Sequence, residues 1–327
     1  MGIKGLTNLI RENSPNSIKH EGLYTLKDKK LAIDTSIFLY KSLTNVRYKG
    51  DYLRNGHGKP VSHIVGILNK TVKFLSLGIT PIYIFDGKPP DEKRECLDER
   101  NRKSKECIQK MENATGKEKL DLEKASVRIT KNHIEDLKHL FHLMGVSYIQ
   151  VDGEAESYAA EMCRMGLVDA VVTEDMDTLV YGCPIVIRDC IDRTIKRPDV
   201  ITTFNYQQIL TDMGLTPDQF SDMCILCGCD YCPTIPKIGT KRAYQHIKQF
   251  GTIEKIIETH RFDVSEQFLK RYVRSRDLFK IFREKIDPKE YPIVESSLKS
   301  EELYSYLVSD CSMSTTKVQN ALKRITR

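Results

Sequence analysis

Short apolar runs alternate with amphipathic, helix-like stretches through roughly the first two thirds of the chain. The runs are rich in Ile, Val and Tyr, which favour strands. They are KKLAID (29–34), TPIYIFD (80–86), GVSYIQV (145–151), VDAVVTED (168–175) and PIVIRD (184–189). Because strands that alternate with helices are typical of α/β proteins, we predict a mostly parallel central sheet flanked by helices.

Two further regions have a helical pattern without intervening strands. Residues 91–131 are highly charged and are interrupted by NATG at 113–116, which predicts two polar helices joined by a turn. From about residue 217, TPDQF opens one helix, PTIPKIG forms a turn, and TKRAYQHIKQFG opens another. The two polar helices of 91–131 are expected to project from the sheet rather than to pack in it.

The composition is that of an ordinary globular protein with a modest basic excess. The chain has 327 residues, 40% of them apolar and 29% charged, and a formal net charge of +6. This excludes a histone-like polycation and leaves room for a basic face that meets a polyanion. No apolar run approaches the ~20 residues that span a bilayer, and no secretory pattern opens the chain. We therefore expect an intracellular protein without membrane contact.

Ten cysteines at irregular spacings indicate reduced thiols rather than a disulfide framework. A CxxCxCxxC pattern, which could suggest zinc, is formed by Cys224, Cys227, Cys229 and Cys232. All four lie in DMCILCGCDYC, which continues a helix-like pattern, and one helix cannot easily wrap four sulfurs around an ion. Buried thiols are therefore favoured over a zinc site.

Acidic residues follow four of the predicted strands. They are Asp34, Asp86, Glu154, Glu156, Asp175 and Asp177. Singly, each has a plain explanation, since Asp34 would be a good helix N-cap and Glu154 could complement a helix dipole. Together they predict a cation site, because ligands bind beyond the carboxyl ends of parallel strands and crowded carboxylates repel one another. Spacing alone does not exclude Asp152 and Asp189 from this set.

Hard oxygen ligands select Mg²⁺, or Mn²⁺ in its place. Two such ions, about 4 Å apart, are a common device for in-line displacement at phosphorus. The acidic strand ends therefore indicate phosphodiester chemistry.

Six ordered motifs resemble those of the structure-specific 5′ nucleases, and most closely the flap endonucleases. They are MGIKGL, LAIDTSIFLY, IYIFDGKPP, GEAES, TEDMDTLVYG, and CILCGCDYC followed by IGTKRA. The resemblance runs from Met1 to about residue 260 and more faintly to the end. It implies a PIN-like 5′ nuclease fold with a helical arch and a C-terminal helix-two-turn-helix DNA-binding region.

The resemblance also implies a division of the chain into regions. Residues 1–105 form the N-terminal nuclease region, with an arch that begins at about 91, and residues 106–131 complete the arch. Residues 132–260 form the internal nuclease region, with the helix-two-turn-helix at about 217–250. Residues 261–327 form a C-terminal helical region.

The family's metal carboxylates map onto the six acids above and add Asp230, with Asp177 also counted as catalytic. Its two basic residues after DGKPP fall on Lys93 and Arg100, whose spacing of seven places them on one helical face. The alternative is a solvated charged helix with i to i+4 pairs. The following set is assigned to that alternative: Arg102, Lys103 and Lys105.

DNA contacts are implied for a further set of residues. They are Gly2, Tyr40, Arg128, Lys237, Gly239, Lys241 and Arg242. Tyr40 would stack on a base, although a core aromatic is nearly as good an interpretation of IFLYKSL. The helix-two-turn-helix would hold duplex DNA through amides, basic side chains and K⁺. The family's Gly-Ile-Gly turn is Lys237-Ile238-Gly239 here, so a charge contact could replace the first glycine's backbone contact.

These features predict a Mg²⁺-dependent flap endonuclease and 5′ exonuclease that acts in DNA replication and repair. The rivals are another 5′ nuclease, such as a junction resolvase, a silent DNA-binding scaffold and a small-molecule phosphatase. The expected partner is branched DNA with a 5′ flap, bound by a monomer in the nucleus or another DNA-replicating compartment. We expect weak or absent sliding-clamp binding, because Gln319, Leu322 and Ile325 have the clamp motif's spacing without its aromatics.

Overall fold

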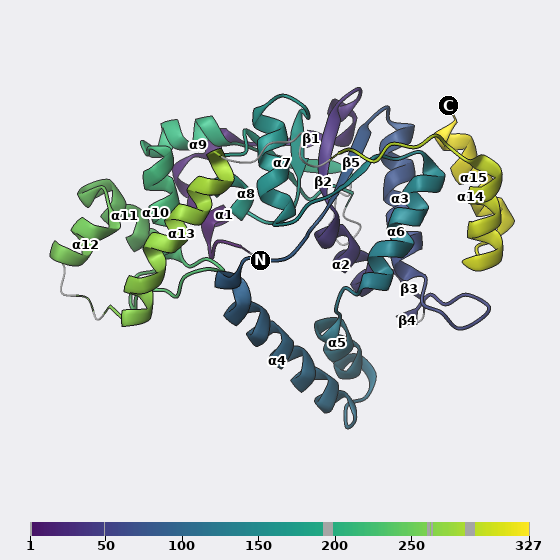
Figure 1. Ribbon diagram of the computed structural model, residues 1–327, viewed down its shortest axis with the longest axis horizontal. Helices are drawn as coiled ribbons and strands as arrows, with labels where there is room; N and C mark the ends of the chain where they lie inside the picture. Colours follow the sequence, from purple (N-terminus) through teal and green to yellow (C-terminus); the bar gives the residue numbers. More distant parts are fainter. Residues whose placement is uncertain are drawn as a thin grey trace. The chain divides into compact units, whose positions relative to one another are not determined.

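The helices and strands of the computed structural model follow the alternation of apolar and amphipathic segments (Figure 1). The structure describes residues 2–48, 50–191, 199–259, 262, 264–284 and 292–326. Two compact units divide the chain, and each is described by itself. Unit 1 comprises Met1–Thr25, Lys88–Cys96 and Asp152–Glu290, and unit 2 comprises Leu26–Gly87, Leu97–Val151 and Tyr291–Arg327.

The strands of unit 1 lie in the order β1-β9-β8-β7. Their bounds are Ile18–Gly22 for β1, Ala170–Val172 for β7, Ile185–Arg188 for β8 and Val200–Asn205 for β9. Strands β7 and β8 are parallel, whereas β9 runs antiparallel to both β8 and β1. The last residues of β7 lead directly into the segment that carries Asp175 and Asp177.

The helices of unit 1 cover this sheet and extend beyond it. They are α1 (Leu6–Asn13), α7 (Ala155–Arg164), α8 (Asp177–Val180), α9 (Tyr206–Met213), α10 (Pro217–Cys227), α11 (Thr240–Phe250), α12 (Ile253–Thr259) and α13 (Glu266–Glu284). Short 3₁₀ turns are η1 (Pro15–Ser17), η2 (Leu23–Leu26), which runs into unit 2, and η3 (Asp91–Lys93). Thr216 and Gln219 form a capping box that starts α10, with Pro217 as its first residue.

Unit 2 has a parallel sheet in the order β2-β5-β6. The bounds are Lys30–Asp34 for β2, Thr80–Phe85 for β5 and Tyr148–Gln150 for β6, and a separate hairpin pairs β3 (Arg47–Tyr48) with β4 (Asp51–Tyr52). Leu31, Ala32 and Ile33 are fully buried, as expected for a parallel strand covered on both faces. Burial therefore fixes the register that brings Asp34 to the carboxyl end of the sheet.

Helices of unit 2 are α2 (Thr35–Asn45), α3 (Ser62–Ser76), α5 (Gly116–Ser126), α6 (Lys131–Met144), α14 (Ser300–Ser305) and α15 (Thr315–Ile325), with a π-turn at Tyr306–Asp310. Helix α4 (Arg94–Met111) begins in unit 1 and continues in unit 2. Figure 1 shows α4 and α5 joined at one end, where the NATG break was predicted. The two polar helices predicted for 91–131 are confirmed.

The predicted fold class is confirmed, with one addition. All five predicted strands are present as β2, β5, β6, β7 and β8, whereas β1, β9 and the short hairpin strands β3 and β4 were not predicted. Of these, β1 and β9 belong to the main sheet. Those two strands supply the antiparallel part of a mostly parallel arrangement. Within the described residues, no helix is both long and apolar enough to cross a membrane.

The cysteine pattern needs one correction. Helix α10 ends at Cys227, and Gly228 turns with a φ of 105°, so Cys229 and Cys232 lie beyond the helix rather than within it. Burial raises the pKa of Cys227 and of Cys232 to about 12, so both are neutral thiols at pH 7. Metal ligation requires thiolates, and burial therefore works against zinc binding by these sulfurs.

Candidate active site and DNA-binding residues

Five of the seven predicted metal carboxylates belong to unit 1. They are Glu154, Glu156, Asp175, Asp177 and Asp230. The first two begin α7, the next two surround the start of α8, and the last follows α10. Helix starts and strand ends therefore place the first four, as the strand-end argument predicted, whereas the end of α10 places Asp230.

Asp177 experiences the strongest crowding in this set. Its side chain is buried, and its Oδ1 has no hydrogen-bond partner among the described residues. Burial, together with repulsion from Asp175 and Asp230, raises the pKa of Asp177 well above its ordinary value. A buried carboxyl in this situation is stabilised either by a proton or by a cation.

Lys93 supplies positive charge to the same group. Its Nζ lies 2.5 Å from Glu154 Oε2 and 3.8 Å from Asp230 Oδ2. Burial disfavours the ammonium form, but attraction to Glu154 and Glu156 outweighs it and holds the pKa of Lys93 above its ordinary value. The ammonium is therefore fully charged, and it is the cation that contacts Glu154 and Asp230 in this structure.

The donor set suits a hard divalent cation. Carboxylate oxygens are the preferred ligands of Mg²⁺ and Mn²⁺, and the unpartnered oxygen of Asp177 is an available donor. Across the described residues, no group of three or more His, Cys, Asp or Glu side chains already has the arrangement to hold an ion. The residues fit the chemistry of a metal site without being gathered into its final geometry.

Gly2 lies against the same carboxylates. A Cβ at this position would collide with Asp175 Oδ1 and would lie 2.6 Å from Asp177 Oδ1. Gly2 also has a φ of 81°, which L-residues rarely adopt. The backbone can approach the acids this closely because the residue has no side chain.

Tyr181 and Tyr231 are buried neighbours that sequence reasoning missed. Their hydroxyls are 2.8 Å apart, and burial with the negative charges of Glu154 and Asp177 raises the pKa of Tyr231 well above its ordinary value. Tyr231 is therefore neutral. The only sequence signal was its position directly after Asp230, which does not distinguish a core aromatic from one that supports a site.

Asp34 and Asp86 belong to unit 2. Asp34 is the N-cap of α2 and accepts hydrogen bonds from the amides of Ser36, at 3.1 Å, and Ile37, at 3.4 Å. The Ser36 hydroxyl donates to Asp86 Oδ2. Ser36, which was not predicted, thus links the acids at the ends of β2 and β5. The capping explanation considered for Asp34 is confirmed, and it leaves the carboxylate oriented by two donors.

Spacing alone did not exclude Asp152 and Asp189 as metal ligands, and the structure shows other contacts for both. The Thr202 hydroxyl donates to Asp189 Oδ2 at 2.7 Å, which ties Asp189 to strand β9. Asp152 is exposed, and its backbone carbonyl accepts from the Lys88 amide at 2.8 Å. These placements favour structural roles for both residues.

The basic residues of η3 and α4 that the sequence singled out have different surroundings. Arg102 pairs with Glu99 and Glu106, and Lys103 pairs with Glu99 at 3.2 Å, which is the charged-helix arrangement predicted for them. Lys93 closes the 3₁₀ turn η3 in unit 1, whereas Arg100 lies in the part of α4 that belongs to unit 2.

Arg128 and Tyr40 both contact the polar helices of unit 2. The Arg128 guanidinium donates to the carbonyls of Arg100 and Val127. The partly buried Tyr40 donates to the Lys124 carbonyl of α5 at 3.5 Å. Tyr40 is therefore not a fully buried core aromatic, and part of its ring remains accessible for stacking.

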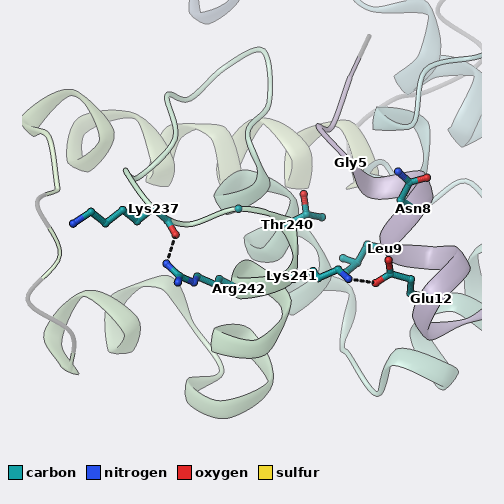
Figure 2. A pocket seen from close by; sticks show the side chains of 9 residues that line it. Gly5, Asn8, Leu9, Glu12, Lys237, Thr240, Lys241 and Arg242 are labelled. Atoms are coloured by element: carbon teal, nitrogen blue, oxygen red, sulfur yellow. Dashed lines mark hydrogen bonds and ion pairs between the residues drawn. The ribbon is translucent and has the colours of Figure 1, made fainter.

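A hollow of about 430 Å³ lies at the start of α11, next to α1 (Figure 2). Its lining residues are Gly5, Asn8, Leu9, Glu12, Lys237, Gly239, Thr240, Lys241 and Arg242. The wall therefore includes all four residues that were predicted to bind DNA at the helix-two-turn-helix, and amides of the first turn of α11 are available there for an anion.

Lys237 takes the left-handed conformation, with a φ of 68°. Its carbonyl accepts from Arg242 Nη1 at 2.9 Å, while Lys241 Nζ pairs with Glu12 at 2.9 Å. Figure 2 shows the Lys237 side chain extending away from α1. Lys237 thus has a backbone conformation that glycine adopts more readily, and it adds a charge.

Sequence comparison finds two matching family models. The XPG N-terminal domain matches residues 1–107, and the XPG I-region matches residues 145–230. Flap endonuclease 1 of Glycine max is 38% identical over 333 residues, which cover 99% of this chain and 86% of that protein. Flap endonuclease 1 of Ostreococcus lucimarinus is 41% identical over 288 residues, which cover 86% of this chain and 73% of that protein.

Comparison with solved structures agrees. The structure of flap endonuclease-1 from Methanococcus jannaschii is 26% identical and superposes with a TM-score of 0.71. The match covers 94% of this chain and 95% of that chain.

Proposed function

This chain belongs to the flap endonuclease family, and from that premise we propose that it is a divalent-metal-dependent nuclease that cuts 5′ flaps. The resemblance stated from the motifs is confirmed. The proposed reaction hydrolyses a DNA phosphodiester near a single-strand to double-strand junction and leaves a 5′-phosphate and a 3′-hydroxyl. It serves DNA replication and repair.

The observation that carries the proposal is the buried acidic group of unit 1 with Lys93 against it. Asp175 and Asp230 act electrostatically on Asp177, which has an unpartnered oxygen, and the Lys93 ammonium contacts Glu154 and Asp230. A structural ion pair would need one acid for one lysine, so the excess of carboxylates supports a role in holding cations. Asp34 and Asp86 are proposed as further ligands, as in the family.

Each residue of the site has a proposed part in the reaction. When bound, two Mg²⁺ or Mn²⁺ ions would activate the attacking water and stabilise the leaving oxygen. Lys93 and Arg100 would donate to oxygens of the scissile phosphate and offset the charge that develops there. No side-chain nucleophile is required.

DNA binding is proposed to depend on phosphate contacts rather than on sequence. Lys237, Gly239, Lys241 and Arg242 surround the hollow at the start of α11, where a duplex phosphate would be held, and K⁺ is a proposed ligand of this region. At the junction, Tyr40 would stack on a base, while Arg128 would face the flap and Gly2 the cleavage site.

The proposed partners and cellular compartment follow from the proposed nuclease activity. We propose a monomer that acts on branched DNA in the nucleus or another DNA-replicating compartment. Gln319, Leu322 and Ile325 lie on helix α15 without the aromatic anchors of a clamp motif, which supports weak or absent clamp binding.

Replacing Asp177 with Asn tests the proposal. Single-turnover cleavage of a 5′-flap duplex with Mg²⁺ should fall by at least about 100-fold, because one metal ligand is lost. Flap binding should be largely retained, since Asn is isosteric. Glu301→Gln, on the exposed surface of α14, is the matched control and should cleave like the wild type.

Full activity of Asp177→Asn would contradict the assignment of the site. Rates of the wild type on a flap, a bubble and a four-way junction test the substrate. Preference for the junction would replace flap cleavage with junction resolution.

A further inference from the structure

Helix α13 presents two polar faces to different neighbours. Gln267, Arg271 and Arg274 recur at i, i+4 and i+7, so they share one side of the helix. Arg276 lies on another side, and the buried Phe268 and Phe279 anchor the helix in the core of unit 1. Because packing and polar contacts hold α13 on several sides, the helix is suited to fix the position of a segment that contacts its Gln267, Arg271 and Arg274 face.

One face of α13 contacts the short segment that carries Lys93. This face is formed by Gln267, Arg271 and Arg274. Arg274 Nε lies 2.6 Å from Glu92 Oε1, and Arg271 makes a two-pronged pair with Glu95, in which Nη1 lies 3.0 Å from Oε2. Gln267 Nε2 adds a hydrogen bond to Glu95 at 3.1 Å. All of these residues belong to unit 1, although nearly 180 positions of sequence separate the partners.

Lys93 lies between Glu92 and Glu95 in the sequence, but its side chain points towards the acidic group and not towards α13. Its ammonium contacts Glu154 and Asp230, and the Cys96 thiol, one turn further along, lies 3.4 Å from Asp230 Oδ1. One side of this short segment thus faces α13, and the next side faces the acidic group. The contacts of Glu92 and Glu95 therefore hold the segment on one side, while the lysine ammonium contacts the acidic group on the other.

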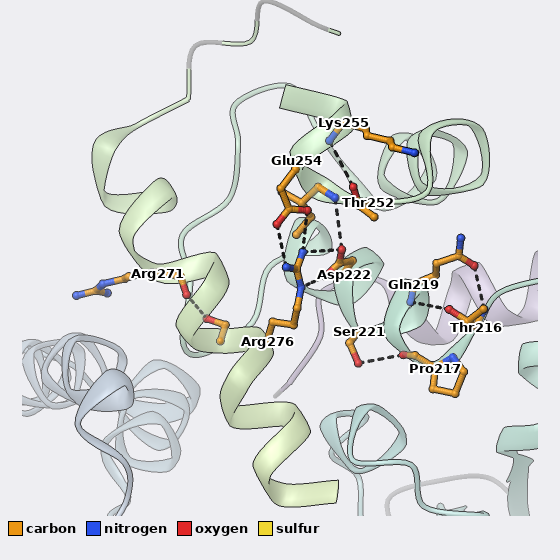
Figure 3. Close-up of polar contacts among 12 residues, drawn as sticks. Thr216, Pro217, Gln219, Ser221, Asp222, Thr252, Glu254, Lys255, Arg271 and Arg276 are labelled. Carbon is orange, nitrogen blue, oxygen red and sulfur yellow. Dashed lines mark hydrogen bonds and ion pairs between the residues drawn. The ribbon is translucent and has the colours of Figure 1, made fainter. Parts of the chain in front are cut away.

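Arg276 ties α13 to α10, which belongs to the proposed helix-two-turn-helix, and to α12 (Figure 3). Its Nε and Nη2 lie 2.7 and 2.8 Å from the carboxylate of Asp222 in α10, and its Nη1 lies 2.9 Å from Glu254 in α12. Asp222 is 4% exposed. Figure 3 shows Arg276 directed into this group while Arg271 extends away from it. Arg276 therefore holds α13 through a multiply bonded ion group around the buried Asp222.

We propose that Arg271 and Arg274 are positioning residues for Lys93, and that α13 holds the lysine segment through Glu95 and Glu92. This inference rests on the proposed nuclease function, in which Lys93 contacts the scissile phosphate. Arg276 also connects α13 to α10 and α12. The contacts of Arg271 and Arg274 therefore fix the position of the Lys93 segment relative to α10 of the helix-two-turn-helix. The exposed pairs contribute little to overall stability, so their purpose is geometric.

The experiment compares single-turnover cleavage of a 5′-flap duplex by the full chain and its variants. Arg271→Gln with Arg274→Gln should lower the rate by about 10-fold to 100-fold, since small displacements of a catalytic group are costly. Flap affinity, measured by fluorescence anisotropy without divalent ions, should stay within about twofold. Lys270→Gln with Lys280→Gln removes the same charge from exposed positions of α13 and should leave the rate unchanged.

A double-mutant cycle separates positioning from a general structural effect. In a Lys93→Ala background, the two glutamine substitutions should change the rate by less than about twofold, because no lysine remains to be positioned. Exchanging the charges of Arg274 and Glu92 gives a second readout. Arg274→Glu should slow cleavage, and adding Glu92→Arg should recover most of the lost rate.

The outcomes distinguish this inference from the function on which it rests. A wild-type protein that leaves the flap intact would overturn the proposed nuclease function and the positioning role with it. If the wild type cleaves and the glutamine pair cleaves equally fast, only the positioning role is overturned. An equal loss of rate with and without Lys93 would likewise overturn it and leave the nuclease assignment standing.

Discussion

Lys237 shows how a single residue can preserve a turn at a cost. A left-handed conformation is unfavourable for a side-chain-bearing residue by about 1 kcal/mol. The structure nevertheless keeps a φ of 68° at this position, and the Lys237 carbonyl accepts from Arg242. The gain that offsets the strain is proposed to be an additional ammonium at the rim of the DNA-binding hollow.

Substituting Lys237 with Gly should therefore separate stability from binding. Relief of the strained conformation should raise the free energy of unfolding by about 0.5–1 kcal/mol, measured by urea denaturation. Loss of one phosphate contact should reduce the slope of log affinity against log salt by about 1 for duplex binding. Anisotropy titrations at several salt concentrations give that slope.

Lys237→Ala is the matched control because it removes the charge and keeps the strain. It should show the same reduction of the salt slope as Lys237→Gly without the increase in stability. An unchanged slope in both variants would show that Lys237 makes no phosphate contact.

At the scale of elements, the start of helix α6 depends on a histidine. Thr130 is the N-cap, and its amide donates to His133 Nδ1 at 3.2 Å, while the His133 amide donates to the Thr130 hydroxyl at 3.3 Å. Burial, with repulsion from the nearby His63, lowers the pKa of His133 from 6.5 to about 4. The capping box thus requires the neutral imidazole, whose Nδ1 is free to accept.

This arrangement predicts a loss of stability in mild acid. Between about pH 4 and 6.5 the unfolded chain binds a proton at His133 that the folded chain does not. The contribution is therefore complete above pH 6.5 and decreases as the pH falls towards 4. His133→Gln keeps the capping box without titrating, so its urea midpoint should fall less between about pH 7.5 and pH 5 than that of the wild type.

His57→Gln, at an exposed histidine, provides the comparison. It should follow the wild-type pH dependence. Identical pH dependence of His133→Gln and the wild type would rule out a role of His133 in acid sensitivity.

Elements were predictable where burial dominates the sequence pattern. Strands β2, β5 and β7 are buried runs of apolar residues, and their positions follow from the sequence alone. Strand β1 has the polar sequence IKHEG without a fully buried residue, and it depends on pairing with β9, whose residues Ile201, Thr202 and Phe204 are buried. The sequences of partly exposed strands show no strong alternation of apolar and polar residues, because such strands are stabilised by pairing with a strand that is distant in sequence.

At the scale of the molecule, the net charge conceals a separation of charge. The seven proposed metal ligands account for seven of the 45 acidic residues, which leaves 38 acids against 51 basic residues. The rest of the chain therefore has an excess of 13 positive charges, which suits a polyanionic substrate.

The strand-end argument found the acids of this site but not its supporting residues. Asp230 required the family resemblance, because it follows a helix. Glu92, Glu95 and Arg271 could not be predicted, since their pairing depends on how α13 packs against a segment almost 180 residues earlier. Local patterns identify donors of charge, whereas tertiary packing decides which of them meet.

The concentrated acids should weaken DNA binding when no divalent cation is present. Asp175→Asn with Asp177→Asn removes two acidic groups, and because burial and repulsion already disfavour the charged form of Asp177, the fold should tolerate the change. In EDTA, the double variant should bind a 5′-flap duplex about 3-fold to 10-fold more tightly than the wild type, because phosphate repulsion is reduced. Fluorescence anisotropy measures both affinities.

Adding Ca²⁺, which takes the same oxygen ligands, should reverse the order by tightening the wild type more than the variant. A second double variant, Glu301→Gln with Glu302→Gln on α14, makes the same change in net charge away from the site and should respond to Ca²⁺ like the wild type. If this surface variant gained as much affinity in EDTA as the site variant, the effect would come from net charge alone. A gain confined to Asp175 and Asp177 would instead locate the repulsion in the acidic group beside Lys93, where cations are proposed to bind.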